Sequence, residues 1–184
     1  MLSVRSYVQA DAAAWNALID RSRNGNFLHR RSYMDYHADR FVDQSLMIER
    51  NGEIVAVFPA NIQDNVVASH GGLTYAGLIS GHALRAESTL AVFEQMGDHY
   101  RALGVDRVIY KAVPHVFHSY PAEEDLYALH RQGARLKRRD ISSVISLRER
   151  FHFTQGRRQS VEKARGAGIR LQRAGEMTDF HALL

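Results

Sequence analysis

The chain has no cysteine among its 184 residues. This absence excludes disulfide bonds, a thiolate nucleophile and a cysteine-ligated zinc site. No apolar run approaches the roughly 18 residues that a membrane-spanning helix needs. The first residues also lack the long apolar core of a secretory signal. We therefore expect a cytoplasmic protein without a membrane span.

The common glycine patterns of nucleotide-binding folds are also absent, both the P-loop and the dinucleotide fingerprint. Residues 69–78 nevertheless read SHGGLTYAGL. Glycines at such density allow close backbone approach or unusual dihedrals, and their N–H groups could hold a carboxylate, carbonyl or phosphate. His70 and Tyr75 would then flank that site as substrate-binding residues. The alternative is a tight turn between strands.

The charge is unevenly distributed. Residues 131–184 hold 13 Lys and Arg against 5 Asp and Glu, whereas the rest of the chain is mildly acidic. Such a basic segment attracts phosphates, whether on nucleic acid, nucleotide-sugars or coenzyme A. The alternative is a solvated helix face. The candidate phosphate-binding residues are Arg138, Arg139, Arg157 and Arg158.

Hydrophobic periodicity predicts one mixed α/β domain, with antiparallel strands first and crossovers later. The clearest local signal is Asn51-Gly52 between two strand-like runs, which is typical of a β-hairpin. The expected strands are 2–7, 45–49, 54–61, 66–69, 107–113, 142–147 and 169–173; the expected helices are 12–19, capped by Asp11, then 31–38, 87–103, 121–132 and 159–165. We expect this domain to cover residues 1–175, with 176–184 beginning a helix that opens a truncated second domain.

The segment 110–127, YKAVPHVFHSYPAEEDLY, mixes imidazoles, aromatic rings and carboxylates at the end of an expected strand. A polar pocket would use all three. His115 and His118 are spaced as a helical metal pair would be, but Pro114 and Pro121 bracket them and favour a loop. We therefore predict no metal and assign the histidines to proton transfer or substrate hydrogen bonding.

The acidic run 123–125 could simply provide capping charge for the helix that follows. The functional interpretation is that one of its carboxylates accepts a proton from an attacking amine. The candidate catalytic residues are Asp125, Glu124 and His118, and the candidate substrate-binding residues are His70, Tyr75, Lys111, His115 and Tyr120.

Several stretches together carry a family resemblance. They are 27–29, 57–60, 69–78, 110–114 and 120–127, continuing through 138–140 and 157–158. In order and spacing this set resembles GNAT-like acyltransferases of the FemAB type, over nearly the whole chain. The pyrophosphate-binding loop of the wider family is not evident in the sequence. Arg165-Gly166-Ala167-Gly168 resembles it only weakly.

The resemblance implies a mixed-sheet GNAT-like acyltransferase domain. It implies acyl or aminoacyl transfer to an amine of a small or cell-envelope-related substrate, as in polysaccharide biosynthesis. The donor would be acyl-CoA, or alternatively aminoacyl-tRNA. It also implies a second GNAT-like domain or a homo-oligomer as partner, so that this portion alone could be inactive.

A different class of function remains open from the residues themselves. The basic last third could make the chain a non-catalytic module that binds an anionic partner, RNA or a glycan. Few aromatic residues interleave these arginines, so the stacking platform of single-strand nucleic-acid binders is missing.

Overall fold

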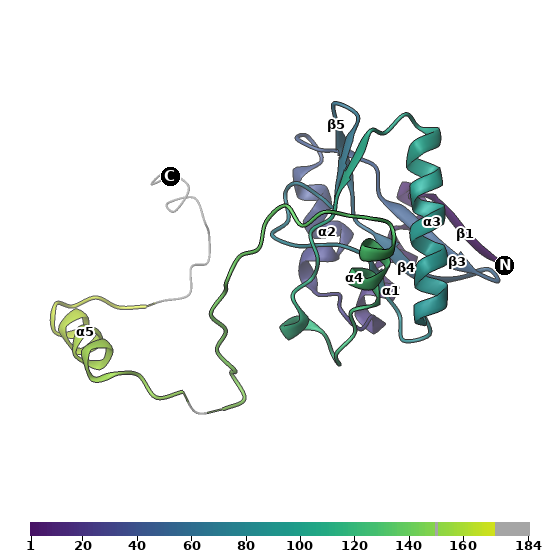
Figure 1. Cartoon of the computed structure of the whole chain (residues 1–184). Helices are drawn as coiled ribbons and strands as arrows, with labels where there is room; N and C mark the ends of the chain where they lie inside the picture. The colour runs from purple at the N-terminus through teal and green to yellow at the C-terminus, as the bar shows by residue number, and fades with distance from the viewer. Residues whose placement is uncertain (150, 172–184) are drawn as a thin grey trace. The chain divides into compact units, whose positions relative to one another are not determined.

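The computed structural model describes residues 1–149 and 151–171 (Figure 1). The chain divides into two compact units, Met1–Leu136 and Lys137–Leu184. The domain boundary expected after residue 175 lies outside the described residues and stays a prediction. The first unit contains both sheets and all but one of the described α-helices. The fold class expected from the sequence, mixed α/β, is confirmed.

The first sheet is antiparallel, in the order β1-β3-β4-β7. Its strands are β1 (Leu2–Ser6), β3 (Leu46–Arg50), β4 (Glu53–Phe58) and β7 (Ile79–Ser80). The hairpin between β3 and β4 turns at Asn51 and Gly52, whose φ angles are 53° and 82°. Positive φ at both central residues matches the twist of the flanking strands. The hairpin prediction is therefore confirmed.

Helices cover both faces of this sheet. Helix α3 (Ala86–Ala102) runs alongside β1, β3 and β4 (Figure 1). Its Val92, Phe93 and Met96 pack in one core cluster with Ile48 and other strand residues. Helix α1 (Ala12–Arg21) packs on the opposite face through a second cluster, whose members include Trp15, Leu18, Met47, Val57 and Ile79. Two-sided burial explains why residues 46–48 of β3 and 54–58 of β4 are continuously apolar.

The second sheet has the order β2-β5-β6-β8. Its strands are β2 (Val42–Asp43), β5 (Asn61–Gln63), β6 (Val66–Ala68) and β8 (Arg107–Ile109). β6 and β8 are parallel, and α3 forms the crossover between them. Helix α4 (Glu124–Arg131) follows β8 and contacts α3, burying Ala128. The end of β8 and the first turn of α4 therefore belong to one compact unit.

Short helical turns fill the connections. They are η1 (Gln9–Asp11), η2 (Phe27–His29), α2 (Arg31–Met34), η3 (Asp35–His37) and η4 (His115–Phe117). The predicted helix 31–38 is thus divided into an α-helical turn and a 3-10 turn. Asp11 precedes α1 as predicted but does not cap it, because its carboxylate instead pairs with Arg5 and accepts the Val8 N–H.

The sequence-based boundaries of several elements need correction. Residues 142–147 form no strand, and the predicted strand at 169–173 is likewise absent over its described part, 169–171. A strand needs a neighbour for its hydrogen bonds, and no described residue provides one there. The helix predicted from Pro121 begins at Glu124. The basic helix predicted at 159–165 is present as α5 (Gln155–Gly166), which begins four residues earlier. The expected helix at 176–184 lies outside the described residues.

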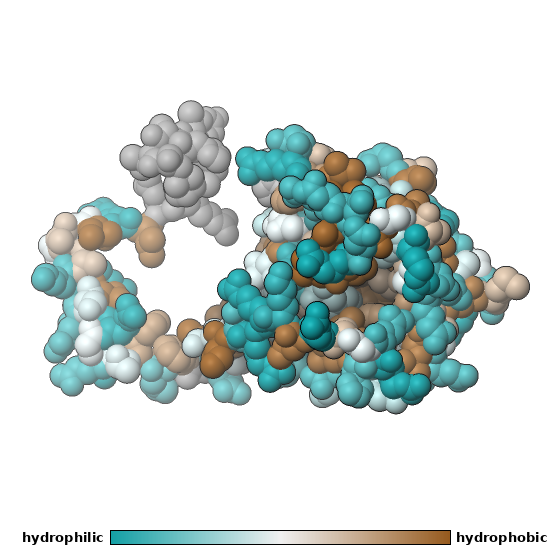
Figure 2. All heavy atoms as spheres, turned by 45° about the horizontal axis from the view of Figure 1, so that its top comes forward, coloured by the Kyte–Doolittle hydropathy of each residue, from teal (hydrophilic) through white to brown (hydrophobic). Residues whose placement is uncertain are grey.

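Apolar side chains are exposed in this second unit, including Ile141, Val144, Leu147 and Phe153. Figure 2 shows such residues among hydrophilic ones. Among the described residues of both units, no helix is long and apolar enough to cross a membrane.

Candidate functional site

The glycine-rich segment 69–78 lies beside the end of β8. Ser69 donates its N–H to the carbonyl of Ile109 at 2.9 Å, and Ala76 donates to the carbonyl of Lys111 at 3.0 Å. Between these contacts, the phenolic oxygen of Tyr110 accepts the Leu78 N–H at 2.8 Å. The glycine-rich segment and the start of the segment 110–127 are therefore in direct contact.

Gly77 makes this contact possible. Its φ is +67°, and a Cβ built there would lie 2.8 Å from the hydroxyl oxygen of Tyr110. Any larger residue would have to displace the ring as well as adopt a left-handed backbone. Glycine at this position is thus explained by the close approach that the sequence pattern suggested.

Asp125 lies at the start of α4 and meets Tyr110. The phenolic O–H donates to Asp125 Oδ2 at 2.6 Å, and the backbone N–H of Leu126 donates to Oδ1 at 2.9 Å. Burial raises the pKa of Asp125 above that of an ordinary aspartate, although its hydrogen bonds and the nearby His118 and Arg23 act in the opposite direction. Burial, and then the charge of Asp125, raise the pKa of Tyr110 well above its usual value. Tyr110 therefore remains a proton donor in this pair.

Arg23 completes the cluster from the connection after α1. Its side chain is only 6% exposed, and Nη1 donates to Glu124 Oε1 at 3.1 Å. Nε donates to Ser80 Oγ at 2.8 Å, which fixes the guanidinium against the first sheet. Sequence reasoning missed Arg23 because a single arginine in a turn gives no local sign that it will be buried.

His118 lies at the same place. Its Nε2 is 3.2 Å from the carbonyl oxygen of Val113, and its charged form would stabilise the Asp125 carboxylate. Two buried polar atoms of this cluster, His118 Nδ1 and Glu124 Oε2, have no hydrogen-bond partner within the described part of the chain. We call the set Arg23, Tyr110, His118, Glu124 and Asp125 the carboxylate cluster. It contains all three candidate catalytic residues.

Two of the candidate substrate-binding residues make internal contacts beside this cluster. Lys111 Nζ donates to the backbone carbonyls of His70, at 2.7 Å, and of Leu73. Burial lowers the pKa of this lysine. His70 is buried and has a φ of 44°. Lys111 thus holds the turn 70–73 in place.

The other three lie along the 115–120 loop or against it. Tyr75 is stacked on Phe117, with ring centroids 5.1 Å apart, and its hydroxyl accepts a hydrogen bond from Asn26 at 3.0 Å. Tyr120 lies against the ring of His82 at 5.3 Å. His115 is exposed. Tyr75 and Tyr120 therefore contact different neighbours rather than each other.

The four candidate phosphate-binding arginines belong to the second unit. Arg138 pairs with Asp140 at 2.9 Å in irregular chain. Arg157 and Arg158 lie in the first turn of α5, where the Thr154 hydroxyl accepts the Arg157 N–H. All four are exposed, which suits an external anionic partner. In residues 1–149 and 151–171, no group of three or more His, Asp or Glu side chains could hold a metal ion.

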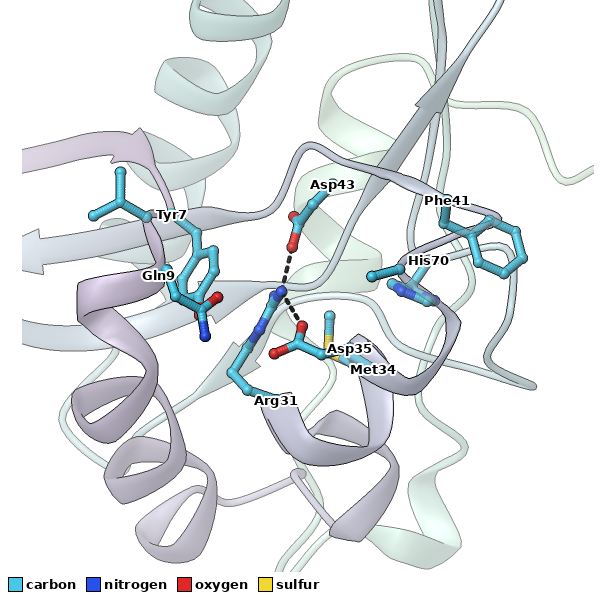
Figure 3. Close-up of a pocket in the computed structure, with 10 residues that line it drawn as sticks. Tyr7, Gln9, Arg31, Met34, Asp35, Phe41, Asp43 and His70 are labelled. Carbon is cyan, nitrogen blue, oxygen red and sulfur yellow. Dashed lines mark hydrogen bonds and ion pairs between the residues drawn. The ribbon is translucent and has the colours of Figure 1, made fainter.

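A separate pocket of about 410 Å³ opens beside η1, α2 and β2 (Figure 3). At its centre Arg31 bridges Asp35, at 2.5 Å, and Asp43 through one nitrogen, Nη2. The guanidinium carbon lies 3.9 Å from the centre of the Tyr7 ring. Sequence reasoning did not identify this pocket, although Arg31 and Asp35 have the i, i+4 spacing of a helical ion pair.

Comparison with known proteins gives a similarity of architecture. No family model matches the chain, and no curated protein matches it. Among solved structures, a ribosomal-protein-alanine N-acetyltransferase from Brucella melitensis biovar Abortus 2308 aligns with 14% identity and a TM-score of 0.46, covering 82% of this chain and 99% of that one.

Two further structures are similar. A ribosomal-protein-alanine N-acetyltransferase from Escherichia coli aligns with 13% identity and a TM-score of 0.43, covering 57% of this chain and 63% of that chain, which is less than two thirds of its length. A GNAT-family acetyltransferase from Streptococcus pneumoniae aligns with 15% identity and a TM-score of 0.36, covering 57% of this chain and 70% of that one. At TM-scores below 0.5 these similarities do not by themselves identify the family of the chain.

Proposed function

We propose that the chain transfers an acyl group to an amine, with Asp125 as the proton acceptor. The observation that carries this proposal is the carboxylate cluster, in which a partly buried aspartate with a raised pKa is held between Tyr110 and the α4 backbone. A carboxylate whose pKa is raised toward working pH is a better general base than an ordinary one.

In the proposed reaction, the amine nitrogen attacks the carbonyl carbon of an acyl thioester. A C–N bond forms, the C–S bond breaks, and the nitrogen loses a proton to Asp125. The sulfur leaves as a thiolate that takes up a proton to become the thiol. Glu124 and His118 complete the set, since each has one buried polar atom that a substrate could satisfy.

Further parts of the proposal rest on the family resemblance. Acyl-CoA is the donor, and its phosphates would be bound by Arg138, Arg139, Arg157 and Arg158, whose planar forks fit phosphate oxygens. The acceptor is a small or cell-envelope-related amine in the cytoplasm, bound near His70, Tyr75, Lys111, His115 and Tyr120. A second GNAT-like domain or a second copy of the chain is the proposed partner.

The test is Asp125→Asn, which preserves size and removes the base. Thiol release from acetyl-CoA should be measured with a panel of amines, together with the melting temperature. We expect turnover to fall by about 100-fold or more, in line with the usual contribution of a general base. Asp98→Asn is the matched control because Asp98 is 74% exposed on α3. A folded Asp125→Asn protein with full turnover would exclude Asp125 as the base.

A second candidate function is the binding of an anionic partner, RNA or a glycan. It is favoured by α5, where Arg157, Arg158, Lys163 and Arg165 lie on a helix with no fully buried residue. The logarithm of the binding constant falls linearly with the logarithm of the salt concentration, and each phosphate contact contributes about one unit to the steepness of that slope. The double variant Arg157→Gln, Arg158→Gln should therefore reduce the slope for a model RNA by about two. A slope near zero in the parent protein would dismiss this function.

A further inference from the structure

The pocket around Arg31 has the lining of a small-molecule site. Its volume of about 410 Å³ lies within the roughly 300–1,000 Å³ of typical ligand pockets. Tyr7, Val8, Met34, Ala38 and Phe41 supply apolar surface. Figure 3 shows Tyr7 on one side of Arg31, and Phe41 with His70 on the other. The polar groups are concentrated in the middle, around the guanidinium.

The rim beside Phe41 is formed by the glycine-rich segment. A Cβ built on Gly71 or Gly72 would lie 2.8 Å from the Phe41 ring. The N–H of Gly71 donates to Asn61 Oδ1 at 2.5 Å, so this backbone is held in place from β5. The glycines thus let the ring lie directly on the main chain, where it forms one wall of the pocket.

The charge of this pocket does not balance internally. Among the described residues that line it, Arg31 provides one positive charge and Asp35 and Asp43 provide two negative charges. Counting these three side chains, the pocket carries a formal charge of −1. The side chains of Asp35 and Asp43 are 34% and 37% exposed, so a cation can reach both. Charge balance therefore favours a ligand with a single positive charge.

Arg31 adds a second requirement. Its side chain is only 6% exposed, yet Nε and Nη1 have no hydrogen-bond partner within the described part of the chain. These two nitrogens carry N–H donors and no acceptor. Buried donors without partners are costly, and an acceptor from a ligand would relieve that cost. The acceptor must be neutral, because a carboxylate would cancel the positive charge that the two aspartates favour.

We propose that this pocket binds a protonated α-amino amide with an apolar side chain, such as the first residue of a peptide or an amino-acid amide. The ammonium group binds between Asp35 and Asp43, and the neutral carbonyl accepts from Arg31. The apolar side chain packs against Phe41, on the side of the pocket away from Tyr7. This site is separate from the carboxylate cluster, and its occupancy does not depend on whether Asp125 acts as a base.

The experiment measures binding of four probes to the full chain by isothermal titration calorimetry at pH 6.5, below the usual α-amino pKa of about 7.7–8.0. The probes are L-phenylalanine amide, L-phenylalanine, N-acetyl-L-phenylalanine amide and phenethylamine. We expect the amide to bind at least tenfold more tightly than each of the others. They lack, respectively, the net positive charge, the ammonium group and the carbonyl.

Two variants and one control locate the site. Asp43→Asn removes a charge but keeps the oxygen that accepts the Ser45 N–H at 2.7 Å, and Asp35→Asn removes the other charge. Each should weaken binding of L-phenylalanine amide at least tenfold. Asp39→Asn, on the same stretch, is 76% exposed and should not change binding.

The proposal is overturned by any of three results. They are no binding of L-phenylalanine amide, equal binding of its N-acetyl derivative, or unchanged affinity in both pocket variants. Equal affinity for phenethylamine would overturn the contact between the carbonyl and Arg31. Melting temperatures of all variants show whether a lost affinity reflects lost folding. Asp35→Asn and Asp43→Asn act on different segments, so one remains informative if the other does not fold.

Discussion

Tyr110 and Asp125 lie 15 residues apart in the sequence and are joined by a 2.6 Å hydrogen bond between phenol and carboxylate. The same phenolic oxygen accepts the Leu78 N–H. One side chain therefore ties the glycine-rich segment to the first turn of α4. The mutual position of the candidate catalytic carboxylate and the glycine-rich backbone depends on this hydroxyl.

Removal of that hydroxyl tests its structural role. Tyr110→Phe should lower the free energy of unfolding by about 1–3 kcal/mol, because the Leu78 N–H and Asp125 each lose a partner in a buried setting. The pKa of Asp125 should also rise further, since the tyrosine hydrogen bond now lowers it. Urea unfolding and carboxyl NMR titration measure the two effects. Unchanged stability and an unchanged titration would show that the bond carries little free energy.

Gly77 offers a test of close approach with an internal control. Gly77→Ala introduces a Cβ at 2.8 Å from the Tyr110 hydroxyl oxygen at a φ of +67°. Gly52→Ala has the same backbone strain at +82° but meets nothing within 4 Å. We expect Gly52→Ala to cost about 1–2 kcal/mol from strain alone, and Gly77→Ala to cost at least about 1 kcal/mol more from overpacking. Equal losses in chemical denaturation would mean that the Tyr110 ring moves aside freely.

The ion pair between Arg23 and Glu124 should depend on both partners. Arg23 is buried, whereas the Glu124 side chain is 27% exposed, so the glutamate is partly solvated. Glu124→Gln should therefore lower the free energy of unfolding by about 1–3 kcal/mol. This is less than the roughly 3–5 kcal/mol lost when one partner of a fully buried ion pair is removed. Arg23→Met should cost more, since it also frees Ser80 and removes the positive charge near Asp125.

A double-mutant cycle with both substitutions isolates the coupling between the two side chains. Guanidinium unfolding of the four proteins gives the required free energies. A coupling energy near zero would indicate that the two groups act independently despite their 3.1 Å separation.

His29 should control part of the acid sensitivity. It is fully buried, and burial lowers its pKa from 6.5 to about 4. Between pH 6.5 and 4 the unfolded chain binds a proton that the folded chain excludes. Stability therefore falls as the pH drops through this range, by up to about 3 kcal/mol.

His29→Gln should remove that part of the pH dependence, whatever it costs at neutral pH. The measurement is the free energy of unfolding at pH 7 and pH 4.5 for both proteins. His115→Gln, at an exposed position, should retain the dependence of the parent protein. If the free energy of unfolding falls by the same amount between pH 7 and pH 4.5 in the parent protein and in His29→Gln, the acid sensitivity belongs to other groups.

Local patterns in the sequence predicted most of the first unit. The Asn51-Gly52 hairpin and the apolar period of α3 both follow from interactions between residues close in the chain. Such signals act over one turn or one hairpin and need no distant partner. The same reasoning explains why Asp125, Glu124 and His118 could be selected from one short segment.

Local patterns failed where a partner outside the predicted element decides the outcome. Residues 142–147 have the composition of a strand, but no described neighbour completes the hydrogen bonds of a strand there. The sequence predicts Asp11 as a helix cap, yet Arg5 on β1 competes for its carboxylate at 2.6 Å. Arg5 is only six residues before Asp11, but the pairing depends on how the chain turns between β1 and α1, which the periodicity of the helix does not show.

The residue types, the basic last third, the mildly acidic remainder and the short-range elements are thus properties of the chain itself. Only the tertiary structure decided that Arg23 and Arg31 are buried, that Tyr110 reaches both Leu78 and Asp125, and that Phe41 lies on Gly71 and Gly72. The reason is that burying a charge becomes favourable only when partners from other segments replace water around it. For Arg23 the partners Ser80 and Glu124 lie far away in the sequence, and only the packing of the first sheet and α4 brings them together. For Arg31 the partners are closer in the chain, but the burial of the side chain still depends on the packing of α2 beside Tyr7 and β2.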